Sequence, residues 1–228
     1  MAEISSTILS GSILLPTTEN TSSAGNIWFD GTNVKYSTLG ASTWSAGGAL
    51  IIARRSVAGA GTQNAGLAFG GNCSPVVLSC TEEYDGTSWS AGGALATARF
   101  ALAGAGTQNA GLAFGGFSSP NNLSCTEEYD GSSWTAGGAL ITTRAALAGV
   151  GEQNAGLAFG GITPSAVSCT EEYDGTSWAS GGTLITARWY SAGAGTQNAG
   201  LSFGGRTPSV SGLSCTEEYS QAIVACTL

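Results

Sequence analysis

Histidine is absent from the 228 residues, and charged residues make up only 10% of them. Without histidine, a Ser/His/Asp triad, a cysteine nucleophile activated by histidine and a histidine-ligated copper centre are all excluded. Lysine and arginine together number 7 against 15 acidic residues, so the net charge is −8. Such a chain lacks the basic stripe that neutralises phosphates, and we expect no binding to nucleic acid or to anionic membranes.

Long hydrophobic runs are also missing. No apolar stretch reaches the length of a membrane span, and residues 1–16 lack the basic segment that begins a signal peptide. We therefore expect synthesis in a cytoplasm, no membrane insertion and no secretion by the usual route.

One stretch of eleven residues, G-T-Q-N-A-G-L-A-F-G-G, occurs four times almost letter for letter. The copies begin at Gly61, Gly106, Gly151 and Gly195. Leucine and phenylalanine alternate with small residues before a double glycine, which is typical of a short strand. A second run of small residues precedes each Gln-Asn turn, so each copy predicts a hairpin. Its glycines and alanines suit the crowded innermost strands of a radial array.

Each hairpin is followed by a variable loop, a strand L-S-C-T-E-E-Y-D-G, a strand around T-S-W-S-A-G-G-A-L and an arginine. The repeated tryptophans are Trp44, Trp89, Trp134 and Trp178, at spacings of 45, 45 and 44 residues. This period is in the range of a β-propeller blade. The order predicts four strands in each unit.

The unit resembles the kelch repeat over residues 44–219. The motifs that carry the resemblance are Gly70-Gly71, Glu83-Tyr84, Trp89 and Arg99. It implies an all-β, kelch-like β-propeller in residues 41–228, with four blades of four antiparallel strands. Residues 1–40 would form an N-terminal arm or adaptor with one hairpin at 26–37. Two alternatives stay open: five blades that include this hairpin, or blades completed between chains.

The whole chain is also similar in composition to predicted tail-fibre and other virion proteins of marine bacteriophages. The similarity lies in G-N-I-W-F-D-G-T-N-V-K-Y-S at 25–37, joined to A-G-G-A-L and G-L-A-F-G-G units. It implies a virion structural protein, assembled in the host cytoplasm, that attaches to other virion proteins through its N-terminal segment and forms a homo-oligomer. The alternatives are a free lectin-like glycan-binding module and an intracellular kelch interaction scaffold.

Paired glutamates directly precede the tyrosine of each unit, and an arginine ends each tryptophan strand. Because neighbouring residues of a strand face opposite ways, one glutamate should meet an arginine and the other should face solvent. The predicted structural ion-pair residues are Arg99, Arg144, Arg188, Glu82, Glu83, Glu127, Glu128, Glu171 and Glu172, with Arg54 or Arg55 as the first arginine. An acidic binding site is the alternative. Consecutive glutamates do not converge as glycosidase carboxylates must, so we expect no enzyme activity.

No feature indicates a cofactor or a metal. The glycine runs have neither the following helix nor the lysine of a phosphate cradle. One cysteine recurs in each unit, at Cys80, Cys125, Cys169 and Cys215. A small buried thiol fits this position, although a disulfide involving an extra cysteine such as Cys226 stays open. No pair has C-x-x-C spacing.

Recognition is expected in the loops after the double glycines, at 72–77, 117–122, 162–166 and 206–212, because these loops differ while the strands do not. They should lie on one face of the propeller. The candidate residues are Asn72, Phe117, Asn121, Asn122, Thr163 and Arg206, with Trp189 and Tyr190, which replace Phe100-Ala101 of the second unit. The repeated tryptophans and tyrosines are assigned to the core between blades, with sugar stacking as the alternative.

The fourth unit ends without a tryptophan strand, whereas residues 42–50 form a tryptophan strand with no complete unit before it. We predict that residues 42–50 complete the final blade and close the ring. The alternative is that residues 222–228 supply this strand.

Overall fold

The computed structural model describes residues 27–29, 34–36 and 43–221. The chain divides into two units, Met1–Ala46 and Gly47–Leu228. In the first unit, β1 (Ile27–Phe29) pairs antiparallel with β2 (Val34–Tyr36) as a separate two-stranded sheet. This hairpin follows the sequence prediction, but it adds no fifth blade. The proposed turn at Asp30-Gly31 lies outside the described residues.

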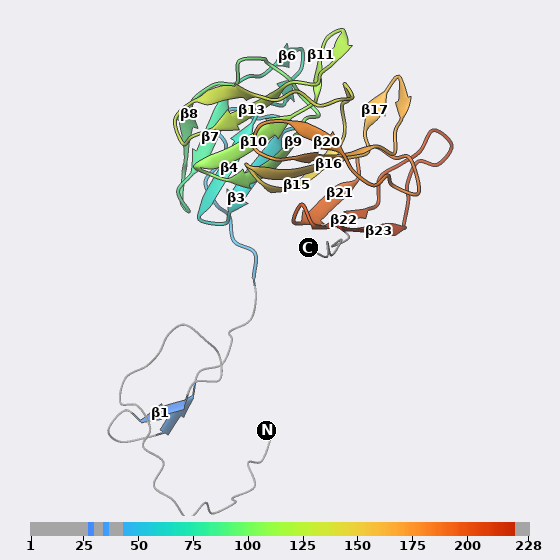
Figure 1. Ribbon diagram of the computed structural model, residues 1–228. Helices are drawn as coiled ribbons and strands as arrows, with labels where there is room; N and C mark the ends of the chain where they lie inside the picture. The colour runs from blue at the N-terminus through green and yellow to red at the C-terminus, as the bar shows by residue number, and fades with distance from the viewer. Residues whose placement is uncertain (1–26, 30–33, 37–42, 222–228) are drawn as a thin grey trace, which may run out of the picture. The chain divides into compact units, whose positions relative to one another are not determined.

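The second unit is an all-β, four-blade β-propeller (Figure 1). Blade 1 contains β3 (Ala58–Thr62), β4 (Ala65–Phe69), β7 (Thr81–Tyr84) and β8 (Trp89–Gly92). Blade 2 contains β9 (Ala103–Thr107), β10 (Ala110–Phe114), β13 (Thr126–Tyr129) and β14 (Trp134–Gly137). Blade 3 contains β15 (Ala148–Glu152), β16 (Ala155–Phe159), β19 (Thr170–Tyr173) and β20 (Trp178–Ser180). Blade 4 contains β21 (Ala192–Gly195), β22 (Ala199–Phe203) and β23 (Thr216–Ser220).

All strands within a blade are antiparallel, and each blade follows the chain order from its innermost strand outwards. Short hairpins follow the double glycines of the first three blades: β5 (Asn72–Cys73) with β6 (Val76–Val77), β11 (Phe117–Ser118) with β12 (Asn121–Asn122), and β17 (Ile162–Thr163) with β18 (Ser165–Ala166). No helix in the described residues is long and apolar enough to cross a membrane.

The core lies between blades, where a large side chain of one blade meets a glycine of the next. Phe69 is fully buried, and a Cβ added at Gly104 would stand 2.6 Å from its Cζ and 2.8 Å from the carbonyl oxygen of Gly59. A side chain at Gly104 would therefore push the two innermost strands apart. This close approach is what the glycine-rich strands predict.

The prediction that residues 42–50 complete the last blade is wrong for this structure. Residues 43–50 form no strand, Trp44 is fully exposed, and the sheet of blade 4 has three strands. Phe203 of blade 4 is exposed, whereas the equivalent Phe69, Phe114 and Phe159 of the other blades are buried. The alternative strand at 222–228 lies outside the described residues.

Candidate recognition site on the hairpin face

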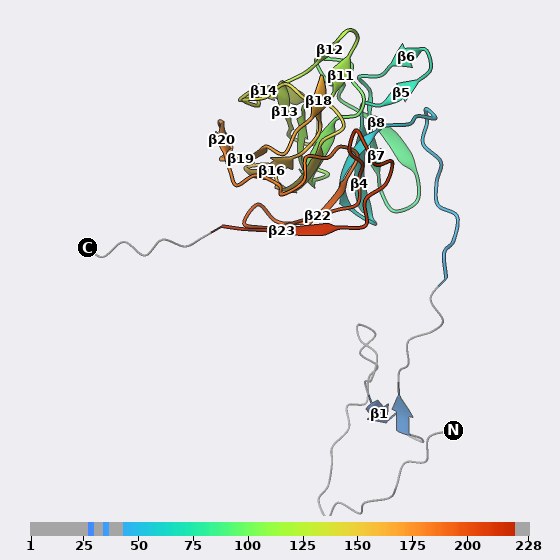
Figure 2. The same cartoon turned by 90° about the vertical axis from the view of Figure 1, so that its right-hand side faces the viewer.

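The variable loops gather on one side of the propeller. In both Figure 1 and Figure 2 the β5–β6, β11–β12 and β17–β18 hairpins project from the upper side. One backbone bridge in each blade fixes the loop to the segment that enters that blade. The bridges are Arg55 with Asn72, Phe100 with Phe117, Ala145 with Ile162, and Trp189 with Arg206. Loops that differ in sequence are thus held at equivalent places of one scaffold.

A ladder of left-handed residues lies beside these bridges. Ser56, Ala101, Ala146 and Tyr190 have φ values of 53°, 51°, 52° and 55°. The N–H of Ala101 donates to the carbonyl of Ser56 at 2.9 Å, Ala146 to Ala101 at 2.7 Å, and Tyr190 to Ala146 at 2.8 Å. These bonds hold an unfavourable backbone conformation in place and join the four blades.

A hollow of about 340 Å³ opens over this ladder. Its main side chains are Phe100, Phe117, Asn122, Ile162, Pro164 and Tyr190. The wall is largely apolar, and Phe100 and Phe117 meet edge to face with ring centroids 5.4 Å apart. Asn122 donates from Nδ2 to the carbonyl of Ile162 at 2.9 Å, which fixes one polar group at the rim. Apolar walls with few fixed polar groups are typical of ligand sites.

Arg206 gives this face a positive charge beside two aromatic rings. Its guanidinium carbon lies 5.0 Å from the ring centroid of Trp189 and 5.2 Å from that of Tyr190. Trp189 is buried, whereas Tyr190 is 56% exposed. Within residues 43–221, no carboxylate forms a salt bridge with Arg206. A guanidinium beside aromatic rings has the chemistry that binds acidic or hydroxylated groups.

The structure brings together some of the predicted recognition residues and separates others. Phe117, Asn122 and Tyr190 line the hollow, and Trp189 and Arg206 lie beside it. Asn121 is exposed on β12, and Thr163 is half-buried on β17. Asn72 belongs to the hairpin of blade 1 and does not line the hollow, although its Oδ1 is buried without a hydrogen-bond partner.

Sequence reasoning missed part of the lining. Phe100, Ile162 and Pro164 contribute to the hollow. Phe100 occupies the same bridge position as Trp189, so comparison of the four units at that position could have identified it.

The glutamates and arginines form buried structural pairs. The carboxylate Oε1 lies 3.0 Å from Nη2 in both Arg99–Glu127 and Arg144–Glu171. Arg54 pairs with Glu82, and Arg188 pairs with Glu217. Arg54, and not Arg55, is therefore the first arginine of the series.

The paired side chains also form hydrogen bonds with backbone groups. Arg99 donates from Nη1 to the carbonyls of Gly115 at 3.1 Å and Cys125 at 2.7 Å. The backbone N–H of Ala96 donates to Glu127 at 2.6 Å. These carboxylates are neutralised and satisfied, so they are poor candidates for acid or base catalysis.

Three of the second glutamates, Glu83, Glu128 and Glu172, are half-buried and do not face solvent as predicted, whereas Glu218 is exposed; none of them forms a salt bridge among the described residues. Glu83, Glu128 and Glu172 accept hydrogen bonds from the hydroxyls of Tyr129, Tyr173 and Tyr219, each in the following blade. The prediction treated the face that carries these glutamates as exposed, but in blades 1 to 3 the following blade covers that face. Burial, and then the hydrogen bond to Glu83, raise the pKa of Tyr129 to about 12.

The cysteines give no sign of a chemical role. Cys73, Cys80, Cys125, Cys169 and Cys215 are free thiols, and Cys226 lies outside the described residues. Burial raises the pKa of Cys125, whose Sγ accepts a hydrogen bond from Arg99 at 2.8 Å. The thiols were predicted to be buried, but Cys80, Cys125 and Cys169 are half-buried, and Cys215 is exposed because blade 4 is uncovered on one side. The described residues contain no cluster of three cysteine or acidic side chains that could hold a metal ion.

Comparison with known proteins adds no identification. No protein-family model matches the chain, and no curated protein matches it.

Proposed function

We propose that this chain is a non-enzymatic structural protein of a bacteriophage particle, either a tail fibre or another exposed fibre or decoration component. The observation that carries the proposal is a rigid array of near-identical blades that holds different loops on one face. Recognition proteins commonly combine a rigid scaffold with variable loops. The kelch-like order of the motifs and the phage-like composition of residues 25–37 support the same assignment.

In this proposal, residues 1–40 attach the chain to other virion proteins, and the hairpin face contacts the host surface. The apolar hollow and the Trp189–Tyr190–Arg206 group suit a ligand with a flat apolar side and an acidic or hydroxylated edge. Surface glycans have this chemistry, because a sugar ring stacks on aromatic side chains while its polar groups bind donors. We assign no catalysis, cofactor or metal to the chain.

Mass spectrometry of purified phage particles tests the proposal. We expect peptides of this chain to co-purify with the capsid proteins through a density gradient, at a constant ratio across the particle peak. Host cytosolic proteins should vary across the same fractions. Absence of the chain from intact particles would refute a virion role, and glycan binding by the free chain would then favour the lectin-like alternative.

Substitutions on the hairpin face test separately whether this face contacts the host surface. Arg206→Ala should weaken binding of particles to host cells about 5- to 30-fold, which corresponds to about 1 to 2 kcal/mol of cation–aromatic interaction. Val210→Ala changes another exposed residue of the same loop and should leave binding unchanged. Equal binding by both variants would remove Arg206 from the contact surface.

A further inference from the structure

A tryptophan fills the junction between blades 1 and 2 and the junction between blades 2 and 3. Trp134 of blade 2 donates from Nε1 to Oγ1 of Thr81 in blade 1 at 2.8 Å. Its ring centroid lies 4.9 Å from those of Phe69 and Tyr129. Trp178 repeats this arrangement with Thr126 at 2.8 Å, and with Phe114 and Tyr173 at 4.9 Å. A phenylalanine and a threonine of one blade and a tyrosine of the next therefore define the indole position.

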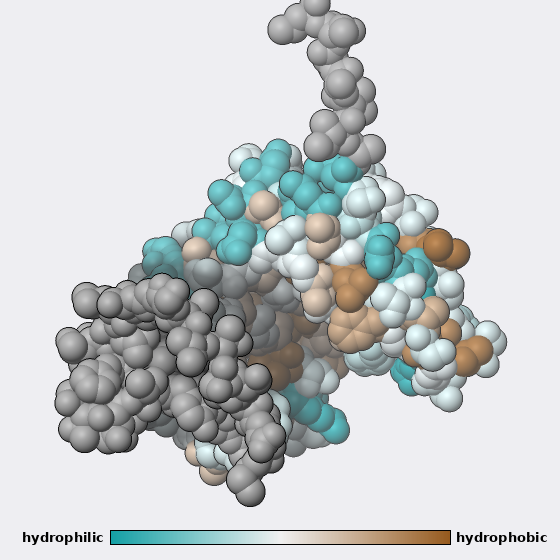
Figure 3. Space-filling model, turned by 90° about the horizontal axis from the view of Figure 1, so that it is seen from below, coloured by the Kyte–Doolittle hydropathy of each residue, from teal (hydrophilic) through white to brown (hydrophobic). Residues whose placement is uncertain are grey.

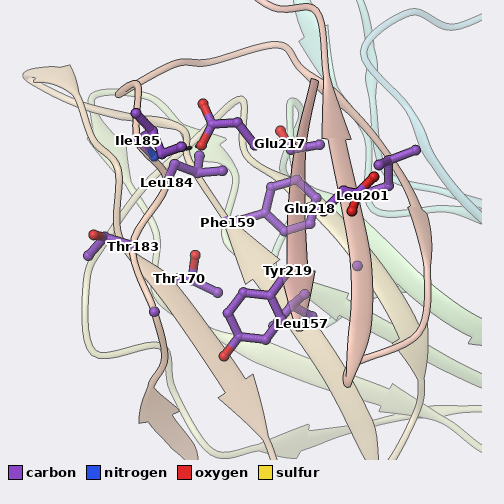
Figure 4. Close-up of a pocket in the computed structure, with 13 residues that line it drawn as sticks. Leu157, Phe159, Thr170, Thr183, Leu184, Ile185, Leu201, Glu217, Glu218 and Tyr219 are labelled. Atoms are coloured by element: carbon purple, nitrogen blue, oxygen red, sulfur yellow. Dashed lines mark hydrogen bonds between the residues drawn. The ribbon is translucent and has the colours of Figure 1, made fainter. Parts of the chain in front are cut away.

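The same position between blades 3 and 4 is a pocket. Phe159, Thr170, Gly200 and Tyr219 line it, and they are the equivalents of the residues around Trp134 and Trp178. Figure 4 shows the rings of Phe159 and Tyr219 and the side chain of Thr170 around this space. No strand of the described residues pairs with the outer edge of β23. The pocket thus has the lining residues and the threonine acceptor of the tryptophan sites at the other two junctions.

The face of blade 4 that points away from blade 3 is also uncovered. Phe203 is 39% exposed, whereas its equivalents Phe114 and Phe159 are 0% and 3% exposed. Glu218, the equivalent of the tyrosine-binding glutamates, is exposed as well. Figure 1 places β22 and β23 on the lower side of the propeller, and Figure 3, which views this side, shows hydrophobic residues exposed there.

The opposite end of the array, at blade 1, has the complementary features. A Cβ at Gly111 would meet Cδ2 of Leu67 at 2.7 Å, but the equivalent Gly66 has no leucine against it. Val57 is 39% exposed, whereas the equivalent Leu102 is 6% exposed.

A side-chain amide at this end also lacks the partners that its equivalents have. Gln108 donates from Nε2 to the carbonyls of Gly66 at 3.1 Å and Tyr84 at 2.8 Å in the preceding blade, and Gln153 and Gln197 donate equivalently. Among the described residues, the side chain of Gln63 has no such partner. One end of the array therefore presents the donors and small residues, and the other presents the acceptors and large residues.

The segment around Trp44 has the sequence of the tryptophan strand that blade 4 lacks. Its order, T-W-S-A-G-G-A-L, matches S-W-S-A-G-G-A-L around Trp89. A Cβ at Gly47 would lie 2.8 Å from the hydroxyl oxygen of Tyr84, as one at Gly92 would lie 2.6 Å from that of Tyr129. Gly47 therefore meets blade 1 as Gly92 meets blade 2.

We propose that copies of this chain associate head to tail. The tryptophan segment of one copy, residues 43–47, becomes the fourth strand of blade 4 in another copy, and blade 1 of the first copy packs on that blade. By the register of Tyr129 with Trp134, Trp44 pairs with Tyr219 and its indole enters the pocket. The occupant is a second copy because both end faces of a single chain are exposed, and the contact continues the junction already present between blades.

This interface joins two different surfaces, so a pair of copies still has one free blade 1 end and one free blade 4 end. Such contacts repeat until they close a ring or form a filament. The inference does not depend on the proposed virion role, because it concerns the purified chain alone.

Complementation between two variants tests the inference. Trp44→Ser removes the indole that would enter the pocket but leaves the blade 4 surface intact. Phe203→Glu blocks the blade 4 surface but leaves the Trp44 segment intact. Both positions are exposed, so both variants should fold, and Glu218→Lys provides a second acceptor variant. Light scattering after size exclusion should give the monomer mass, 22.6 kDa, for each variant alone and multiples of it for the wild type. A mixture of the two should form a one-to-one complex of twice the monomer mass.

Val76→Ser, on an exposed hairpin away from both ends, should assemble like the wild type. A wild-type chain that stays monomeric at every concentration would overturn the inference, because its own residues would then satisfy the pocket or leave it empty. Failure of the two variants to combine, with thermal unfolding like that of the wild type, would also overturn it.

Discussion

Phe114→Ala should destabilise the propeller strongly, because it removes a ring that is fully buried between blades 2 and 3. The ring centroid of Phe114 lies 4.9 Å from that of Trp178, and the ring fills the space that Gly149 leaves open. Large-to-small changes of this kind cost about 3 to 5 kcal/mol, because the cavity collapses only partly. For a domain of this length, the melting temperature should fall by about 6 to 20 °C.

Urea unfolding measures the loss, and the slope of the transition should stay unchanged. The measurement is best made with Trp44→Ser present in every variant, so that association does not add to stability. Asn121→Ala, on an exposed hairpin, should change the free energy of unfolding by no more than about 0.5 kcal/mol. Phe69→Ala should match Phe114→Ala, because Phe69 fills the equivalent position. Equal midpoints for Phe114→Ala and Asn121→Ala would refute the packing account.

Two further predictions concern the charged and tyrosine networks. Glu127→Gln should lower the free energy of unfolding by about 3 to 5 kcal/mol, because it leaves Arg99 buried without its counter-charge. Glu128→Gln keeps an acceptor for Tyr173 and should lower it by about 1 kcal/mol. Urea unfolding midpoints of the two variants measure the difference. The pKa of Tyr129, about 12, lies above the value of about 10 for an unfolded tyrosine, so the folded state binds this proton more tightly. Stability should therefore be full below pH 10 and fall as pH rises towards 12, and Tyr129→Phe should flatten this part of the stability–pH profile.

The strands and their grouping into blades could be predicted because every unit repeats the same alternation of large and small residues at the same spacing. Leu67 and Phe69 alternate with small residues, and every unit repeats that alternation. The buried Arg99–Glu127 pair also followed from counting one arginine and one glutamate pair in each unit. These features depend on short-range patterns, which four copies make clear.

Features that depend on contact between blades could not be predicted in the same way. Strand alternation places Glu83 on the opposite face from Glu82, but only the propeller shows that the next blade covers that face with Tyr129. The position of Trp44 depends on whether the two ends of the array meet, which alternation cannot decide. Arg206 and Trp189 were separate deviations in the sequence, and their stacking results from the backbone bridge between them.

Labelling of intact phage particles tests the central claim most directly. Gold-conjugated antibody fragments raised against the β11–β12 hairpin should label the outside of purified particles in electron micrographs, because this hairpin lies on the face that we propose contacts the host. Fragments against an unrelated cytosolic protein control for adhesion. Labelling at fibres or at another exposed position is the predicted result. Labelling that is absent both from intact and from disrupted particles would contradict the claim that this propeller is a virion component.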